Sequence, residues 1–292
     1  MKNIDFDKIR AIDFHTHAEE ACGCHADDGY DELQSTMAQY FGAPWAHPPT
    51  IDQTAAHYRQ MNIAAVIFPV DAERETGYRR YDNYEVADAC ARHDDILIPF
   101  ASIDPAKGRL GAREARDLVA NHGIRGFKFH PTMQGFYPND RMAWPLYEAI
   151  AETGMPALFH TGQTGVGSGM RGGNGMRLKY SNPMFIDDLA VDFPDMPIIL
   201  AHPSFPWQEE ALSVAQHKPN VYIDLSGWSP KYFPKILVQY ANTILRKKML
   251  FGSDWPMIAP EKWLDAFDGA AFRDEVRPMI LKDNALRLLG LA

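Results

Sequence analysis

Short apolar runs recur along the whole chain, and each is bounded by turn-forming residues. The runs are four to eight residues long and mostly continuous, without regular alternation of apolar and polar positions. That pattern is typical of parallel strands whose two faces are both covered. The sequence therefore predicts eight buried strands, at Ala11–His15, Ala64–Pro69, Ile96–Ile103, Ile124–His130, Ala157–His160, Pro197–His202, Val221–Leu225 and Met249–Gly252.

Helical periodicity occupies most of the intervals between these runs, because apolar residues recur there three and four positions apart. Strands that alternate with helices, without an internal repeat, predict an α/β fold: a single (β/α)8 TIM-barrel domain over residues 1–292. An open dinucleotide-binding sheet is the alternative. It is disfavoured because no strand leads directly into a helix through a phosphate-binding Gly-x-Gly-x-x-Gly turn. The helical segments are Thr50–Met61, Asn83–His93, Gly108–His122, Arg141–Thr153, Pro183–Phe193, Pro206–His217 and Pro230–Lys247.

Two connections are longer than the others, and both follow the predicted C-terminal end of a strand. They run from Ala18 to about Pro49 and over Gly162–Ser181. In a barrel, the loops at that end of the strands form the mouth of the active site. We therefore expect both connections to lie beside the functional site.

Ionisable residues stand at the ends of several predicted strands. His15 and His17 are two positions apart, which places both side chains on one face of a strand. His160, His202 and Asp254 end or follow later strands. Because the strand ends of a barrel meet at one mouth, these five groups should converge there. Imidazole and carboxylate ligands suit zinc or a similar divalent cation.

Charge and cysteine content narrow the class of partner and the compartment. The net charge of −9 argues against a nucleic-acid or anionic-membrane partner, and indicates a small-molecule substrate. No leader or membrane-spanning run is evident, and Cys22, Cys24 and Cys90 fit a reducing compartment, so we expect a soluble, cytoplasmic protein. Cys22-Gly-Cys24-His25 is a weaker metal-site candidate, because no second ligand pair follows at structural-zinc spacing.

Five short segments and the closing helix resemble the amidohydrolase superfamily, and in particular its amidohydrolase-related branch of metal-dependent hydrolases, lactonases and nonoxidative decarboxylases. The resemblance extends from residue 11 to residue 291. It implies a TIM-barrel enzyme that binds one divalent cation, zinc with manganese as the alternative. The segments are Asp13–His17, Gly126–Pro131, Leu158–Gly162, Leu200–Pro203 and Gly252–Pro256, and the helix is Lys282–Gly290.

The resemblance also implies roles for individual residues. It implies that His15, His17, His160 and Asp254 are metal ligands, and that His202 is a further ligand or a catalytic acid/base. Lys128 and His130 share one face of their strand, and we expect both to point into the barrel as substrate-binding residues, with a structural role as the alternative for each. A two-metal site bridged by a carbamylated Lys128 is the alternative, since some binuclear members carry such a lysine on this strand.

A cluster of cations on the second long connection predicts the charge of the substrate. Arg171, Arg177 and Lys179 lie within nine residues of one another, so Arg171 and Arg177 are predicted to bind an anionic substrate.

We expect hydrolysis of an ester, lactone or amide-like bond, with Asp254 as general base and His202 stabilising charge on the carbonyl oxygen. Nonoxidative decarboxylation of an aromatic or muconate-type acid is the alternative. A non-catalytic binding barrel is a third hypothesis. The oligomeric state stays open.

Overall fold

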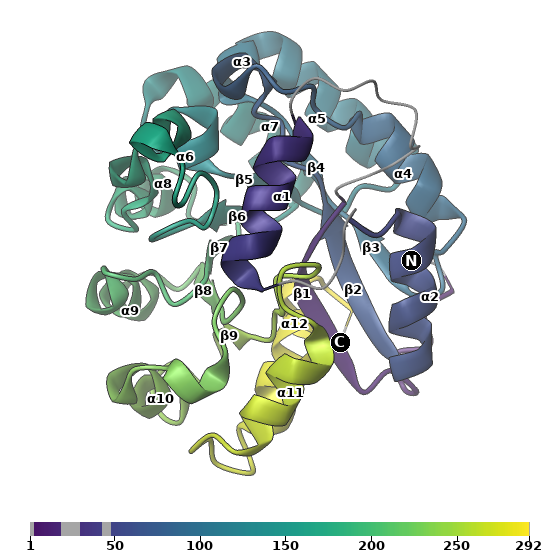
Figure 1. The fold of residues 1–292 in the computed structure, drawn as a ribbon, viewed down its shortest axis with the longest axis vertical. Coiled ribbons are helices and arrows are strands. Elements are labelled where there is room, and N and C mark those ends of the chain that lie inside the picture. The colour runs from purple at the N-terminus through teal and green to yellow at the C-terminus, as the bar shows by residue number, and fades with distance from the viewer. Residues whose placement is uncertain (1–2, 19–29, 43–47, 292) are drawn as a thin grey trace.

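A computed structural model describes residues 3–18, 30–42 and 48–291 of the chain, and its strands are all parallel. They follow one another around the barrel in sequence order (Figure 1). The strands are β1 (Ala11–His17), β2 (Ile63–Phe68), β3 (Leu97–Pro99), β4 (Ala101–Ser102), β5 (Phe127–Phe129), β6 (Ala157–His160), β7 (Ile198–Ala201), β8 (Val221–Asp224) and β9 (Met249–Leu250). All eight predicted strands are present, because β3 and β4 together form the third.

Backbone hydrogen bonds close the barrel at two places where the strand assignment is interrupted. Phe100 separates β3 from β4, and its N–H donates to Ile67 O of β2 at 2.9 Å. The next residue, Ala101, donates to Gly126 O at 3.0 Å beside β5, so one extended segment joins both neighbours. At the other seam, Phe14 N–H of β1 donates to Phe251 O at 2.8 Å. The predicted (β/α)8 barrel is confirmed.

Helices surround the strands at all seven places where the periodicity predicted them (Figure 1). α2 begins with a capping box, in which Thr50 Oγ1 accepts from Gln53 N and Gln53 Oε1 accepts from Thr50 N. The predicted helix over Pro230–Lys247 is shorter in the structure: Pro234 separates a short turn from α10, and α10 ends at Ala241. The seven are α2 (Ile51–Met61), α4 (Asn83–Ala91), α5 (Gly108–His122), α7 (Trp144–Thr153), α8 (Phe185–Asp192), α9 (Gln208–His217) and α10 (Lys235–Ala241).

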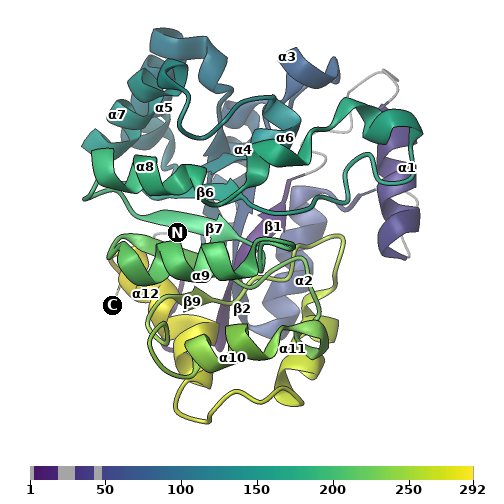
Figure 2. The same ribbon diagram turned by 90° about the vertical axis from the view of Figure 1, so that its left-hand side faces the viewer.

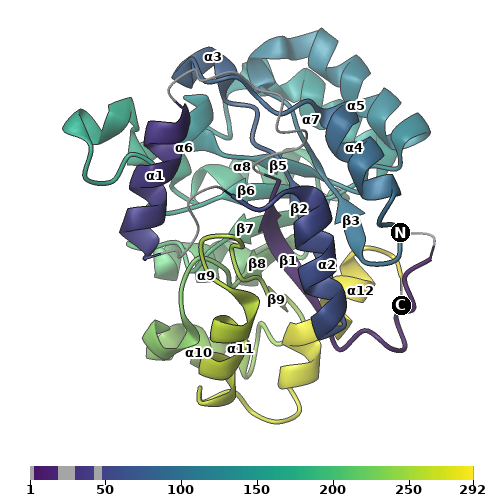
Figure 3. The same cartoon turned by 45° about the vertical axis from the view of Figure 1, so that its right-hand side comes forward.

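Helices that the periodicity did not predict lie mainly in the connections. α1 (Tyr30–Phe41) lies in the first long connection, over the end of the barrel opposite to that of the chain termini (Figures 2 and 3). It packs through a small separate apolar cluster that includes Leu33, Met37 and Met257. The others are α3 (Glu73–Thr76), α6 (Pro131–Gln134), α11 (Pro260–Asp268) and α12 (Asn284–Leu288), the last of which falls in the closing helix expected from the resemblance.

The main core lies between the strands and the surrounding helices. Phe129 of β5 stacks on Phe159 of β6 at 4.8 Å and contacts Tyr147 of α7 at 5.5 Å between ring centroids. Lys128, the residue before it, is also fully buried but projects to the other face of β5, into the barrel, as predicted. Among the described helices, none combines the length and the apolar composition needed to cross a membrane.

Candidate active site

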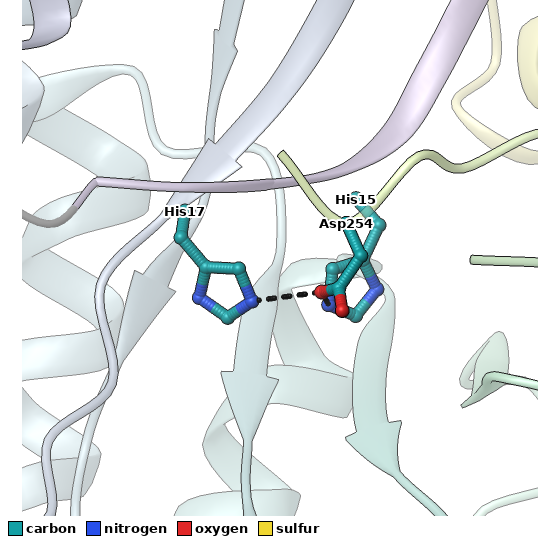
Figure 4. A group of neighbouring side chains, drawn as sticks. All are labelled: His15, His17 and Asp254. Carbon is teal, nitrogen blue, oxygen red and sulfur yellow. Dashed lines mark hydrogen bonds and ion pairs between the residues drawn. The ribbon is translucent and has the colours of Figure 1, made fainter. Parts of the chain in front are cut away.

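Three side chains from the two ends of the chain meet at the mouth of the barrel (Figure 4). His15 and His17 belong to β1, and Asp254 follows β9. One ligand atom from each lies within 4.8 Å of the others. Asp254 Oδ1 is 3.1 Å from His17 Nε2 and 3.3 Å from His15 Nε2. The structure therefore brings together three of the four ligands that the resemblance implied.

The backbone of Asp254 is held in an unusual conformation that turns the carboxylate toward β1. Its φ is 77°, in the left-handed region that a residue with a side chain rarely adopts. The Asp254 N–H donates to His15 O at 3.0 Å, and Asp254 O accepts from Met257 N at 2.9 Å. These two hydrogen bonds hold the strained backbone in place, and backbone strain of this kind occurs most often at functional sites.

Asp13 lies beneath this group and ties its two halves together. Its carboxylate accepts from His15 N at 3.1 Å, from Ser253 N at 2.9 Å and from the Tyr58 hydroxyl at 2.7 Å. Burial raises the pKa of Asp13 to about 6, while these donors act in the opposite direction. Asp13 thus fixes β1 against the segment that carries Asp254.

Three further histidines stand beside the group at the ends of β5, β6 and β7. His202 Nε2 is 3.0 Å from His160 Nδ1, and the His160 ring stacks on His130 at 3.9 Å between centroids. His160 Nε2 is buried and has no hydrogen-bond partner among the described residues. Burial lowers the pKa of His160 well below its ordinary value and that of His202 to about 4. Both rings are therefore neutral near pH 7.

Lys128 reaches the same place from inside the barrel. Its Nζ is 3.1 Å from His15 Nε2 and 4.7 Å from the centroid of the Phe68 ring. Burial lowers the pKa of Lys128 to about 7, because desolvation outweighs the attraction of Asp254 and Asp224. The buried Lys128 amine therefore lies directly beside the His15 ring and lines the cavity.

Asp224 is a site residue that we did not predict. It ends β8, and its Oδ2 lies 2.5 Å from His15 Nδ1 and 2.8 Å from Ser226 Oγ. Burial raises the pKa of Asp224 to about 8, and burial lowers that of His15 well below its ordinary value. The sequence signal existed, because an apolar strand ends in an ionisable residue here as it does at His160.

A cavity of about 270 Å³ opens above these residues. The residues that line it include the five groups predicted to converge at the strand ends, His15, His17, His160, His202 and Asp254, and the two predicted substrate-binding residues, Lys128 and His130. Its walls are mainly apolar and aromatic, and they come from α1 and from the loops that follow several strands. The wall residues include Leu33, Met37, Phe41, Tyr78, Tyr81, Val166, Phe205, Trp228 and Met257.

The predicted cationic residues lie elsewhere. Arg171 and Arg177 are exposed and are not among the described residues that line the cavity. Arg79, from the loop between α3 and α4, does line it, and we had not singled it out. Cys22, Cys24 and His25, the weaker metal-site candidate, lie outside the described residues.

The donor set fits a divalent cation of borderline softness. His15, His17 and Asp254 offer two imidazole nitrogens and a carboxylate oxygen close together. His160 lines the same cavity and has a buried ring nitrogen without a partner among the described residues. Buried polar atoms are normally paired, so this nitrogen fits the role of a further metal ligand. His202 has described partners at both ring nitrogens, so direct ligation would require it to give one up.

A family model described as Amidohydrolase matches residues 12–291, which is nearly the whole chain. The chain belongs to the amidohydrolase family. Among curated proteins, this amidohydrolase is 30% identical over 177 residues to the protein fluG of Emericella nidulans, and the match covers 56% of the chain. It spans only 19% of the fluG protein, so most of that relative has no counterpart here.

Solved structures show the same fold. An uncharacterized TIM-barrel protein from Bordetella bronchiseptica is 23% identical, with a TM-score of 0.80 and coverage of 96% of this chain and 98% of the other. A 5-carboxyvanillate decarboxylase from Sphingomonas paucimobilis is 16% identical, with a TM-score of 0.68 and coverage of 97% of this chain and 100% of the other. A probable 2-pyrone-4,6-dicarboxylic acid hydrolase from Acinetobacter baumannii is 17% identical, with a TM-score of 0.64 and coverage of 96% of this chain and 99% of the other. The first of these two structures is named a decarboxylase and the second a probable hydrolase, and the chain shares its fold with both.

Proposed function

We propose that this amidohydrolase hydrolyses an ester, lactone or amide-like bond of a small molecule with the help of one divalent cation. The observation that carries the proposal is the position of Asp254. Its carboxylate is within 3.3 Å of both His15 Nε2 and His17 Nε2 at the floor of the cavity. A carboxylate there can bind the cation through one oxygen and accept a proton from an attacking water through the other.

We propose zinc as the cation, held by His15, His17, His160 and Asp254, with manganese as the alternative. When bound, such an ion supplies Lewis-acid polarisation of a carbonyl and lowers the pKa of a water. A single ion is the simpler proposal, because one group of converging ligands is found among the described residues. A second ion would require Lys128 to be carbamylated.

The chain's own residues provide the remaining steps. Asp254 takes the proton from water and returns it to the leaving group. Lys128 lies on the cavity floor, and its amine is placed to donate a hydrogen bond to the carbonyl oxygen as negative charge develops. His202 was expected in that role, but its Nε2 already faces His160 Nδ1 at 3.0 Å. For His202 to take part, that contact would have to be exchanged for one to the substrate.

Decarboxylation is the second candidate, and the cavity walls favour it. Tyr78, Tyr81, Phe205 and Trp228 offer aromatic surfaces on which a flat, unsaturated acid can pack. The likeness in fold to the Sphingomonas decarboxylase is consistent with this alternative. The substrate carboxylate and a neighbouring oxygen would bind a cation held by the same ligands; the carbon–carbon bond would break to release carbon dioxide, and the enzyme would protonate the carbon left behind.

A titration experiment separates the two reactions. The zinc-loaded and manganese-loaded protein is tested on aryl esters, lactones, hydroxybenzoates and muconate-type acids, with a pH-stat and a carbon dioxide electrode in the same vessel. Hydrolysis is expected to release acid without carbon dioxide, to stop after chelation and to resume when metal is restored. If the hydroxybenzoates or muconate-type acids released carbon dioxide and the esters and lactones were not hydrolysed, the proposed reaction would be decarboxylation and not hydrolysis. If the protein bound no metal and converted none of these substrates, the non-catalytic binding barrel would be the remaining hypothesis.

We propose further that the substrate is an anion and that Arg79 binds it. With an active anionic substrate, Arg79→Gln is expected to raise KM about tenfold and to change kcat less, because the contact is the same in the ground and transition states. The double variant Arg171→Gln/Arg177→Gln is the matched comparison, since both side chains lie outside the cavity lining. Steady-state kinetics at two salt concentrations measure both. A larger rise in KM for the double variant would show that Arg171 and Arg177 bind the substrate, as the sequence alone predicted.

A further inference from the structure

We infer that Asp224 and Ser226 act as positioning residues that fix the ring protons of three histidines, so that His15 and His160 present bare Nε2 atoms to the cation. The inference deepens the proposed function and rests on cation binding at this site. Asp224 and Ser226 are both completely buried, and neither belongs to the predicted set of site residues. They connect the two halves of the site through one continuous chain of hydrogen bonds.

The direction of the chain is set at its first bond. Ser226 Oγ donates to Asp224 Oδ2 at 2.8 Å, and Ser226 N–H donates to Asp224 Oδ1 at 3.0 Å. A serine hydroxyl has a single proton, and Asp224, in the carboxylate form that the inference assigns to it, accepts the hydrogen bond from that proton. Ser226 Oγ is also 3.0 Å from His202 Nδ1, so it can only accept from that nitrogen. His202 therefore carries its proton on Nδ1.

The same logic continues to His160. A neutral imidazole has one N–H, so the Nε2 atom of His202 is a lone pair. His160 Nδ1 lies 3.0 Å from this atom and must donate to it. The remaining nitrogen, His160 Nε2, is then also a lone pair, and it is the buried atom without a partner among the described residues. The chain of bonds thus ends on a nitrogen that is prepared to bind a cation.

Asp224 controls His15 directly. Its Oδ2 faces His15 Nδ1 at 2.5 Å, while His15 Nε2 points to the cluster with His17 and Asp254. A cation at Nε2 requires the proton on Nδ1, where Asp224 accepts it, and such a partner both orients the ring and makes it a better ligand. One carboxylate therefore serves two ligands on opposite sides of the site.

Two glycines keep this network tightly packed. A Cβ atom built at Gly227 would lie 2.5 Å from His202 Nδ1, and one at Gly252 would overlap Asp224 Oδ1. Neither position can carry a side chain without moving a member of the network. Because Ser226 holds His202 on one side and His160 contacts it on the other, His202 is a positioning residue for His160.

The test uses the full-length protein with ¹⁵N-labelled histidine and three variants. Ser226→Ala removes the acceptor of His202 Nδ1, and Asp224→Asn replaces a carboxylate oxygen by an amide donor. Ser204→Ala is the matched control, because Ser204 is equally buried but bonds to Thr161 Oγ1 at 2.7 Å and to the backbone oxygen of His202 at 3.4 Å, and so to no ring nitrogen of the chain of bonds. Two readouts are used: the ring nitrogen shifts of the metal-free protein, which report the tautomer, and zinc affinity by competition with a chelator.

In the wild-type protein, His202 and His160 are expected to be Nδ1–H tautomers. Ser226→Ala and Asp224→Asn should bring the Nε2–H form of His160 into the spectrum and weaken zinc binding about 10- to 100-fold. Ser204→Ala should leave both unchanged. An Nε2–H His160 in the wild-type protein would overturn the inference without any variant. So would unchanged zinc affinity in both variants, or an equal loss in the control. Failure of the wild type to bind zinc would instead contradict the proposed function, because the tautomers are read without metal.

Discussion

Replacing Asp254 by asparagine is expected to lower kcat by about 10²- to 10⁴-fold, the usual contribution of a general base. An amide can still offer an oxygen to a cation, but it cannot accept a proton from water. Zinc should therefore stay bound, with affinity reduced by the loss of the negative charge. Turnover and metal content are measured on the same preparation, so that loss of the reaction can be separated from loss of the ion.

Asp71→Asn is the matched control for this substitution. Asp71 is a buried carboxylate in the connection that follows β2, it pairs with Lys107 at 2.8 Å, and it is not among the described residues that line the cavity. Its loss should affect the thermal midpoint more than kcat. If Asp254→Asn kept wild-type turnover, the carboxylate would be only a ligand and the base would have to be sought elsewhere. If Asp254→Asn lost its metal completely, the base and ligand roles would need a second variant to separate them.

The barrel and the floor of its cavity were predictable because both follow from local order along the chain. Parallel strands covered on both faces give continuous apolar runs, and the residue at the end of each run must emerge at one mouth. His160, His202 and Asp254 could therefore be placed together without a structure. Asp224 obeys the same rule and was missed, because the predicted strand ran to Leu225, whereas β8 ends at Asp224 in the structure.

The walls of the cavity were less predictable, because they depend on long-range packing. α1 lies in a connection for which the sequence predicted no helix, and a cluster of three buried side chains positions it over the mouth. Arg79 comes from a loop of ordinary length, whereas Arg171 and Arg177 stood out because three cations are close together in sequence. Proximity in sequence on a Gly-rich connection does not decide which side chains face the cavity.

The partner of each histidine could not be read from the sequence either. His15 contacts Asp224, which is 209 positions away, and Asp254, which comes from the other end of the chain. Such pairings depend on which strands are neighbours across the barrel and on the register between them. The sequence predicts which residues reach the mouth, but the proton positions that make them ligands follow from contacts that only the folded chain creates.

Substituting both His15 and His17 by alanine is expected to abolish stoichiometric metal binding and turnover together, while the barrel remains folded. The two imidazoles are half of the proposed ligand set, and a site that is left with His160 and Asp254 cannot compete with a chelator. The fold should survive, because the core lies between the strands and helices and not at the mouth. Metal content by atomic absorption, circular dichroism and the thermal midpoint check the three parts of this expectation.

The single variants and a control refine the same experiment. His17→Ala should leave the thermal midpoint of the metal-free protein nearly unchanged, because its ring is at the cavity surface with 15% of the side chain exposed. His15→Ala should cost about 1–3 kcal/mol of stability, since it leaves the buried Asp224 without one of its partners. His93→Ala is the control: its side chain is 16% exposed and its Nε2 bonds to Asp52 at 2.7 Å, outside the cavity, so it should keep metal and turnover. Stoichiometric metal in the double variant would show that the ion binds elsewhere, and the ligand assignment would then be wrong.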